Sequence, residues 1–182
     1  MHDAVYAAGS YRFESLRRDA ATAPDDLARL LEIWREHAGA GWLPHPRQAT
    51  FDAFVFMIGR VHLVDVRADG RLHYRLYGTG SGYPLDVHKR TTASIRPAGL
   101  RALIEQHYRE CVAERVPIYR EIVVTGPRRT GRMFRLLLPY ACDGATPDLI
   151  VNGFVEDRDM AETFRESEFR ALTEDLVLED PD

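Results

Sequence analysis

The histidine at position 107 is the residue of this chain with the clearest potential for chemistry. His107 lies on an apolar stripe with helical spacing, together with Leu103, Ile104 and Cys111. An imidazole on that stripe faces the interior, where it could ligate a metal centre or transfer a proton. A buried neutral imidazole that needs only one hydrogen bond is the simpler explanation of the same position, and both interpretations stay open.

The other residue types that could do chemistry lack the companions they need. His62 and His73 fall on neighbouring strand-like runs with Asp65 nearby, but a metal site requires three or four converging ligands. Strand alternation turns both histidines toward the outer face, so no metal site is predicted. The two cysteines form no CxxC pair. Cys111, on the helical stripe, is expected to be a small buried residue, and Cys142 an exposed loop residue.

Two glycine-rich stretches resemble nucleotide-binding motifs without meeting their requirements. Residues 78–82 (GTGSG) are followed by Tyr83, where a dinucleotide-binding turn needs a third small residue and then a helix. Residues 126–131 have the glycine spacing of a P-loop but lack its lysine and its hydroxyl residue. No GxSxG elbow occurs either, so we predict no catalytic residues and no enzyme.

The elements that would position these residues have a characteristic order. Two strand-like runs precede one long helical stretch, and three strand-like runs follow it, which predicts an α+β fold with a five-stranded antiparallel sheet and helices over one face. A pocket is expected between that helix and the sheet. The runs are residues 58–66, 71–78, 97–115, 117–125, 132–140 and 149–155.

Alternation along the strands selects a set of side chains to face the helix. With Leu103, Ile104, His107 and Cys111 above them, these residues would form either a filled core or a pocket wall, and the pattern does not separate the two. The inward-facing strand residues predicted in this way are Tyr74, Leu76, Phe134, Leu136, Val151 and Gly153.

Three segments are distinguished along the chain: an N-terminal extension over 1–23, the main domain over 24–157, and a closing helix with an acidic tail over 158–182. The main domain starts with a helix over 26–38 that carries Leu27, Leu31 and Trp34 on one face. These three residues are candidates for a homodimer interface, and packing against their own sheet is the equal alternative.

Three stretches together resemble a PAS domain, of the subfamily that occurs as short single-domain bacterial proteins. They are residues 30–35 and 43–47 (LLEIWR, LPHPR), residues 71–79 (RLHYRLYGT), and residues 134–140 with 148–154 (FRLLLPY, DLIVNGF). The resemblance covers about residues 27–156. It implies sensing of a small ligand or a partner protein, and frequent dimerisation. Haem-binding members use a histidine of the long helix, and His107 is the residue in that element here.

Composition narrows the choice of function. The chain has 182 residues, a formal net charge of −4, scattered basic residues, and no apolar run long enough to span a membrane, so neither nucleic acid nor membrane is the expected partner. The start lacks a secretory pattern, which favours a cytoplasmic location. We therefore expect a PAS-type signalling protein without an attached output domain. A haem sensor is one alternative, and a cone-shaped α+β isomerase or hydratase with His107 or Asp65 as its base is another.

Overall fold

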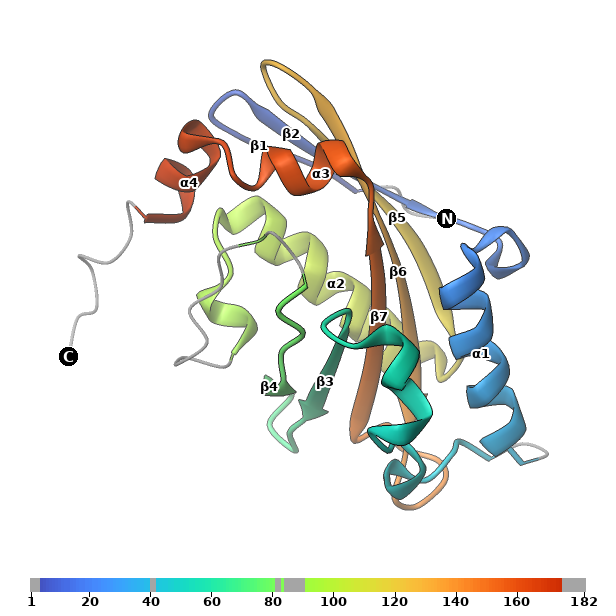
Figure 1. Cartoon of the computed structure of the whole chain (residues 1–182). Coiled ribbons are helices and arrows are strands. Elements are labelled where there is room, and N and C mark those ends of the chain that lie inside the picture. The colour runs from blue at the N-terminus through green and yellow to red at the C-terminus, as the bar shows by residue number, and fades with distance from the viewer. Residues whose placement is uncertain (1–3, 40–41, 81–82, 84–90, 175–182) are drawn as a thin grey trace.

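One antiparallel sheet of seven strands organises the described part of the chain, which comprises residues 4–39, 42–80, 83 and 91–174 of the computed structural model (Figure 1). Its strand order is β1-β2-β5-β6-β7-β3-β4, so the two ends of the sheet are formed by early segments of the chain. The strands are β1 (Ala4–Ala8), β2 (Tyr11–Arg17), β3 (Val61–Val66), β4 (Leu72–Leu76), β5 (Ile118–Thr125), β6 (Thr130–Tyr140) and β7 (Leu149–Glu156).

The prediction of five strands was wrong because the N-terminal segment is part of the sheet. Strand β2 pairs with β5 from Arg12 to Arg17, with Phe13 opposite Val124. Strand β1 pairs with β2 through a turn in which Gly9 has φ +56°. Tyr11 and Phe13 are 1% and 0% exposed. Residues 4–17 therefore belong to the same sheet as the main domain, and no boundary at residue 23 separates them from it.

The long helix α2 (Ala98–Glu114) lies across one face of the sheet, as predicted (Figure 1). It buries Leu100, Leu103 and Cys111 against the strands, in one cluster with β2, β5 and β7 side chains. Two short helices, α3 (Arg158–Thr163) and α4 (Ser167–Glu174), complete this cover by adding Met160, Phe164 and Phe169 to the cluster. The single closing helix expected here is thus two helices. Residues 175–182, which include the predicted acidic tail, lie outside the described residues.

The opposite face of the sheet is covered by α1 (Asp25–His37) and by the 3-10 helix η3 (Asp52–Met57). Leu27 and Leu31 are 0% and 3% exposed, and the indole Nε1 of Trp34 donates a hydrogen bond to the Pro139 carbonyl at 2.8 Å. The residues proposed as a dimer interface therefore pack against their own sheet. Further 3-10 turns are η1 (Ala20–Thr22), η2 (Pro46–Gln48) and η4 (Thr92–Ser94).

Both faces of the central strands are consequently buried. The α2 face and the α1 face each have their own apolar cluster, and β6 and β7 contribute side chains to both. Among the helices of the described ranges, none has the length and apolar character needed to cross a bilayer.

Candidate functional site

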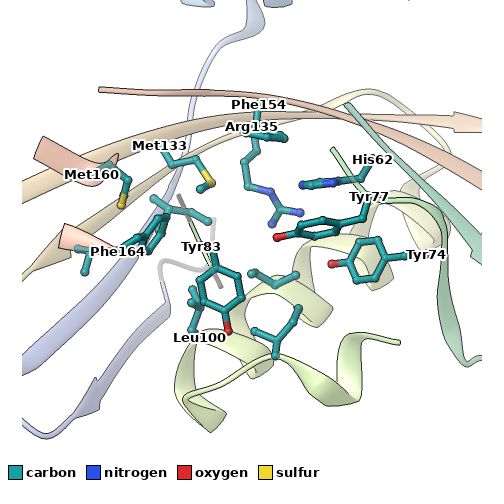
Figure 2. A pocket seen from close by; sticks show the side chains of 14 residues that line it. His62, Tyr74, Tyr77, Tyr83, Leu100, Met133, Arg135, Phe154, Met160 and Phe164 are labelled. Atoms are coloured by element: carbon teal, nitrogen blue, oxygen red, sulfur yellow. The ribbon is translucent and has the colours of Figure 1, made fainter. Parts of the chain in front are cut away.

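A cavity lies between the sheet and α2, near the point where α3 closes over the sheet (Figure 2). It leaves about 40 Å³ for the centres of water-sized molecules, which is room for about three waters. Most of its wall is aromatic or apolar. The wall residues used below are His62, Tyr74, Tyr77, Tyr83, Leu100, Ile104, Met133, Arg135, Phe154, Met160 and Phe164.

The guanidinium of Arg135 enters this cavity from β6, beside the rings of His62 and Tyr77 (Figure 2). Arg135 is 3% exposed, its NH1 lies 3.2 Å from His107 Nδ1, and its Cζ lies 5.2 Å from the centroid of the Tyr108 ring. Within the described residues, no carboxylate forms an ion pair with it. A buried charge without a counter-charge is costly, so this residue requires an explanation.

A second buried arginine stands directly opposite on the neighbouring strand. Arg120 of β5 is the cross-strand partner of Arg135 and is 2% exposed. Its guanidinium forms an ion pair with Glu110 of α2. Like charges opposite each other destabilise a sheet, and Glu110 compensates only one of the two. This part of the buried face thus carries an excess positive charge at Arg135.

His62 lines the cavity with an uncharged imidazole ring that carries one N–H group. Its ring stacks between Tyr77, at a centroid distance of 4.3 Å, and Phe154, at 4.7 Å. The Gly78 amide donates to Nδ1 at 3.0 Å, so the ring hydrogen is carried by Nε2. Burial and the nearby charge of Arg135 lower the pKa of His62 to about 3. The prediction that His62 faces the outside of the sheet was therefore wrong.

The tyrosines of the wall also keep their hydrogens. Burial raises the pKa of Tyr83 to about 12 and, as the main cause, raises the pKa values of Tyr74 and Tyr77 as well. The Tyr83 hydroxyl accepts from the Arg96 amide at 2.7 Å and donates to the carbonyl of the same residue. The polar groups around the cavity are thus one cation, one neutral imidazole and phenols, without an anion among the described wall residues.

His107 lies on the same face but does not line the cavity. It receives a hydrogen bond from Arg135 at Nδ1, and its Nε2 lies 2.7 Å from Ser15 Oγ, to which it donates. Burial, with Arg135 and Arg120, lowers the pKa of His107 well below its ordinary value. An axial haem ligand needs a free ring nitrogen, and both nitrogens are engaged here. The residues present therefore do not fit haem at His107.

Of the predicted pocket residues, Tyr74 and Ile104 line the cavity. Leu103 and Cys111 are buried on the same face beyond it, and burial raises the pKa of the Cys111 thiol. Leu76 is 48% exposed and lines a groove on the α1 face; it pairs with Leu63, next to the register shift between β3 and β4.

The placement of four further candidates beneath α2 was wrong. Leu136 and Val151 belong to the α1 cluster, and Phe134 packs against it. A Cβ on Gly153 would come within 2.4 Å of Leu30 Cδ2, which locates this glycine under α1 as well. The side chains that face α2 from the same strands are instead Met133, Arg135 and Phe154. The alternating residues of β6 and β7 were assigned to the wrong faces because most residues of both alternating sets are apolar.

The remaining candidate residues, Asp65 and His73, lie outside the cavity. Asp65 forms ion pairs with Arg75 at 2.5 Å and Arg67 at 3.5 Å and does not line the cavity. His73 lines a surface groove beside Arg67, away from His62. In the described ranges, no three His, Cys, Asp or Glu side chains come together as a metal site would require.

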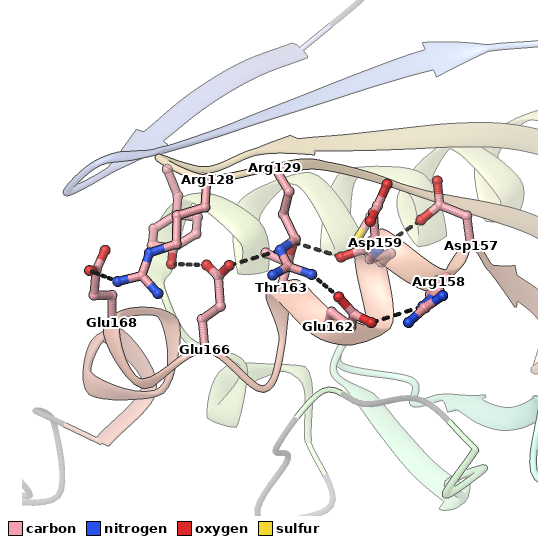
Figure 3. Close-up of polar contacts among 11 residues, drawn as sticks. Arg128, Arg129, Asp157, Arg158, Asp159, Glu162, Thr163, Glu166 and Glu168 are labelled. Carbon is pink, nitrogen blue, oxygen red and sulfur yellow. Dashed lines mark hydrogen bonds and ion pairs between the residues drawn. The ribbon is translucent and has the colours of Figure 1, made fainter.

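The C-terminal helices form the roof of the cavity through Met160 and Phe164. Figure 3 shows how charged residues hold this roof on the β5–β6 hairpin. Arg129 forms ion pairs with Glu162 and, at 3.0 Å, with Glu166, and the latter accepts a hydrogen bond from the Tyr11 hydroxyl at 2.7 Å. The Asp157 carboxylate caps α3 by accepting from the Met160 amide at 2.7 Å.

Comparison of the chain with protein-family models, curated proteins and solved structures finds no match. The cavity, its buried arginine and its helical roof are thus the features from which a function can be inferred.

Because buried His62 is uncharged, the free energy of unfolding should depend on pH. In the unfolded chain its pKa is about 6.5, so the unfolded state binds a proton that the folded state excludes until pH falls to about 3. Stability from this group is complete above pH 6.5 and declines as pH falls. Between pH 7 and pH 5 the loss attributable to His62 is about 2 kcal/mol.

Urea unfolding of the wild type and of His62→Phe at both pH values measures this loss. The phenyl ring keeps the stack between Tyr77 and Phe154 but cannot be protonated, so the variant should lose about 2 kcal/mol less than the wild type. The second buried imidazole, His107, is present in both proteins and cancels in the comparison. Equal losses in the two proteins would contradict a buried neutral His62.

Proposed function

We propose that this chain is a PAS-type sensory domain that binds a small molecule in the cavity beneath α2. The order of its elements supports the proposal: β3 and β4 precede α2, and β5, β6 and β7 follow it within one antiparallel sheet. The residues that carry the resemblance lie in α1, β4, β6 and β7.

The observation that carries the proposal is the buried guanidinium of Arg135 at the wall of an internal cavity. A side chain that served only to fill the core would be apolar at this position, since a buried charge without a counter-charge lowers stability. Binding groups that are poorly satisfied in the free protein gain their partners when ligand enters. Few polar groups in an otherwise apolar concavity are typical of small-molecule sites.

The cavity roof gives the proposed sensor a route for output. Met160 and Phe164 contact the cavity on one side, and α3 leads directly into α4 at the C-terminal end of the described chain (Figure 1). A ligand that changes the packing of these two side chains changes the position of both short helices. A partner protein that contacts this end would then detect the bound state.

A released-ligand assay tests the proposal. The full chain is purified by gel filtration and denatured, and the small molecules it releases are quantified by mass spectrometry. We expect a compound in near-stoichiometric amount from the wild type. Ile104→Trp, which fills the cavity from α2, should release none, whereas Ile58→Trp, at a site that is 63% exposed and outside the cavity, should release the wild-type amount.

Two results would contradict small-molecule binding at this cavity. One is the absence of any compound from the wild type when the protein is purified from several growth conditions. The other is equal release by wild type and Ile104→Trp, which would locate the molecule elsewhere.

A further inference from the structure

We infer that the ligand is a small carboxylate monoanion whose carboxyl group binds the guanidinium of Arg135. This inference rests on the proposed function and specifies the chemical class of ligand for the same cavity. It follows from three properties of the described residues: the charge of the buried face, the direction of the hydrogen bonds available, and the size of the space.

On the sheet face beneath α2, the buried arginines exceed their carboxylate partners by one positive charge. Arg120 and Arg135 are opposite each other on β5 and β6, and Glu110 forms its ion pair with Arg120. One anion bound at Arg135 would balance the excess charge. Sulfate or hydrogen phosphate would add a second charge, which the neutral imidazoles and phenols do not compensate.

The polar groups that could bind a ligand in the cavity, on Arg135 and His62, are hydrogen-bond donors. Arg135 uses NH1 toward His107 Nδ1, which leaves its other N–H groups for a ligand. Because the Gly78 amide donates to Nδ1 of His62, the ring hydrogen is on Nε2, which would donate to a ligand in the cavity. A carboxylate accepts several such bonds and matches the planar fork of a guanidinium. A neutral or cationic ligand would leave these donors without partners.

The size and lining of the space favour a short aliphatic acid. Room for about three waters corresponds to a ligand of about four to six non-hydrogen atoms. Leu100, Ile104 and Met160 also line the cavity and would contact the carbon end of such a molecule. Acetate, propionate and lactate are therefore suitable probes.

Thermal unfolding in the presence of these probes tests the inference, with the full chain first unfolded, dialysed and refolded to remove any compound bound during expression. At a concentration of about one hundred times Kd, the best of the three carboxylates should raise the Tm by about 5 °C. Propionamide, which has the same shape without the charge, and sodium sulfate at equal ionic strength should not. Isothermal titration should give a Kd at least about tenfold weaker for Arg135→Lys, which keeps the charge but loses the fork.

Arg135→Met separates ligand binding from a purely structural role. Without added carboxylate its Tm should equal or exceed that of wild type freed of bound compound in the same way, because an unpaired buried charge has been replaced by an apolar side chain of similar length. The probe should then cause no shift. Arg132→Met is the matched control on the same strand, since this side chain is 56% exposed and pairs with Glu121 on the other face. It should keep the full shift.

The outcomes distinguish failure of the inference from failure of the proposed function. A lower Tm of Arg135→Met without probe would show that the arginine is structural and would overturn the inference, as would equal shifts with propionate, propionamide and sulfate. Stabilisation by none of the three acids would also overturn it. If the released-ligand assay meanwhile yields a neutral compound, the cavity binds small molecules and the carboxylate assignment alone is wrong.

Discussion

Phe13→Ala should lower the free energy of unfolding by about 3–5 kcal/mol, the range for removing a fully buried phenyl group. Phe13 is 0% exposed on β2, opposite Val124 of β5 and 6.4 Å from the ring of Phe169 in α4. Its loss leaves a cavity between the N-terminal hairpin and the C-terminal helices. Denaturant unfolding monitored by circular dichroism measures the change.

Val5→Ala is the control for this substitution. Val5 lies on β1 of the same hairpin but is 54% exposed, so its truncation should change stability by about 0.5 kcal/mol or less. If Phe13→Ala cost no more than Val5→Ala, the N-terminal segment would be an accessory that the sheet does not need. That result would restore the boundary expected from the sequence near residue 23.

Helices α1 and α2 and the five strands after residue 60 could be predicted because each has one strong local signal. Leu100, Leu103 and Cys111 recur at helical spacing, and α2 begins and ends within one residue of the predicted stretch. The strands are short apolar runs bounded by turn residues, and β5 and β7 were located to within one residue. Such signals depend on neighbours in the sequence and not on tertiary contacts.

The N-terminal hairpin was missed because its stabilising contacts are remote. Tyr11 and Phe13 alternate with Arg12 and Glu14, a pattern typical of a half-buried strand, but the segment is short. Its pairing partner β5 begins about one hundred residues later. Only tertiary structure shows that this edge of the sheet is available for it.

The cavity residues were missed for a related reason. Strand β6 is buried on both faces, so the apolar residues of each parity are equivalent in the sequence and the phase of alternation cannot be chosen. Phe134 and Leu136 were therefore assigned to the face beneath α2, which Met133 and Arg135 occupy. The signal that could have identified Arg135 is its isolation: a single charge within the apolar run 133–140 is costly unless a ligand or an ion pair compensates it.

Gly131→Ala should lower the free energy of unfolding by about 2–3 kcal/mol, because the new methyl group meets backbone and not a movable side chain. An ideal Cβ at this position would lie 2.3 Å from Met160 Cα and 2.4 Å from Met160 N. Relief requires α3 to move away from β6, which separates the cavity roof from the sheet. Denaturant unfolding gives the size of the loss.

Two other glycines calibrate this effect. In Gly153→Ala the methyl group would meet Leu30 Cδ2 at 2.4 Å, the end of a side chain that can rotate, so a loss of about 1 kcal/mol is expected. Gly39→Ala finds its nearest neighbour at 3.9 Å and should change stability by about 0.5 kcal/mol or less. The order of losses follows what each methyl group meets: backbone, then a flexible side chain, then an atom at ordinary contact distance. A Gly131→Ala protein as stable as Gly39→Ala would mean that α3 does not rest on β6, and the cavity would then lack the roof through which its ligand is proposed to act.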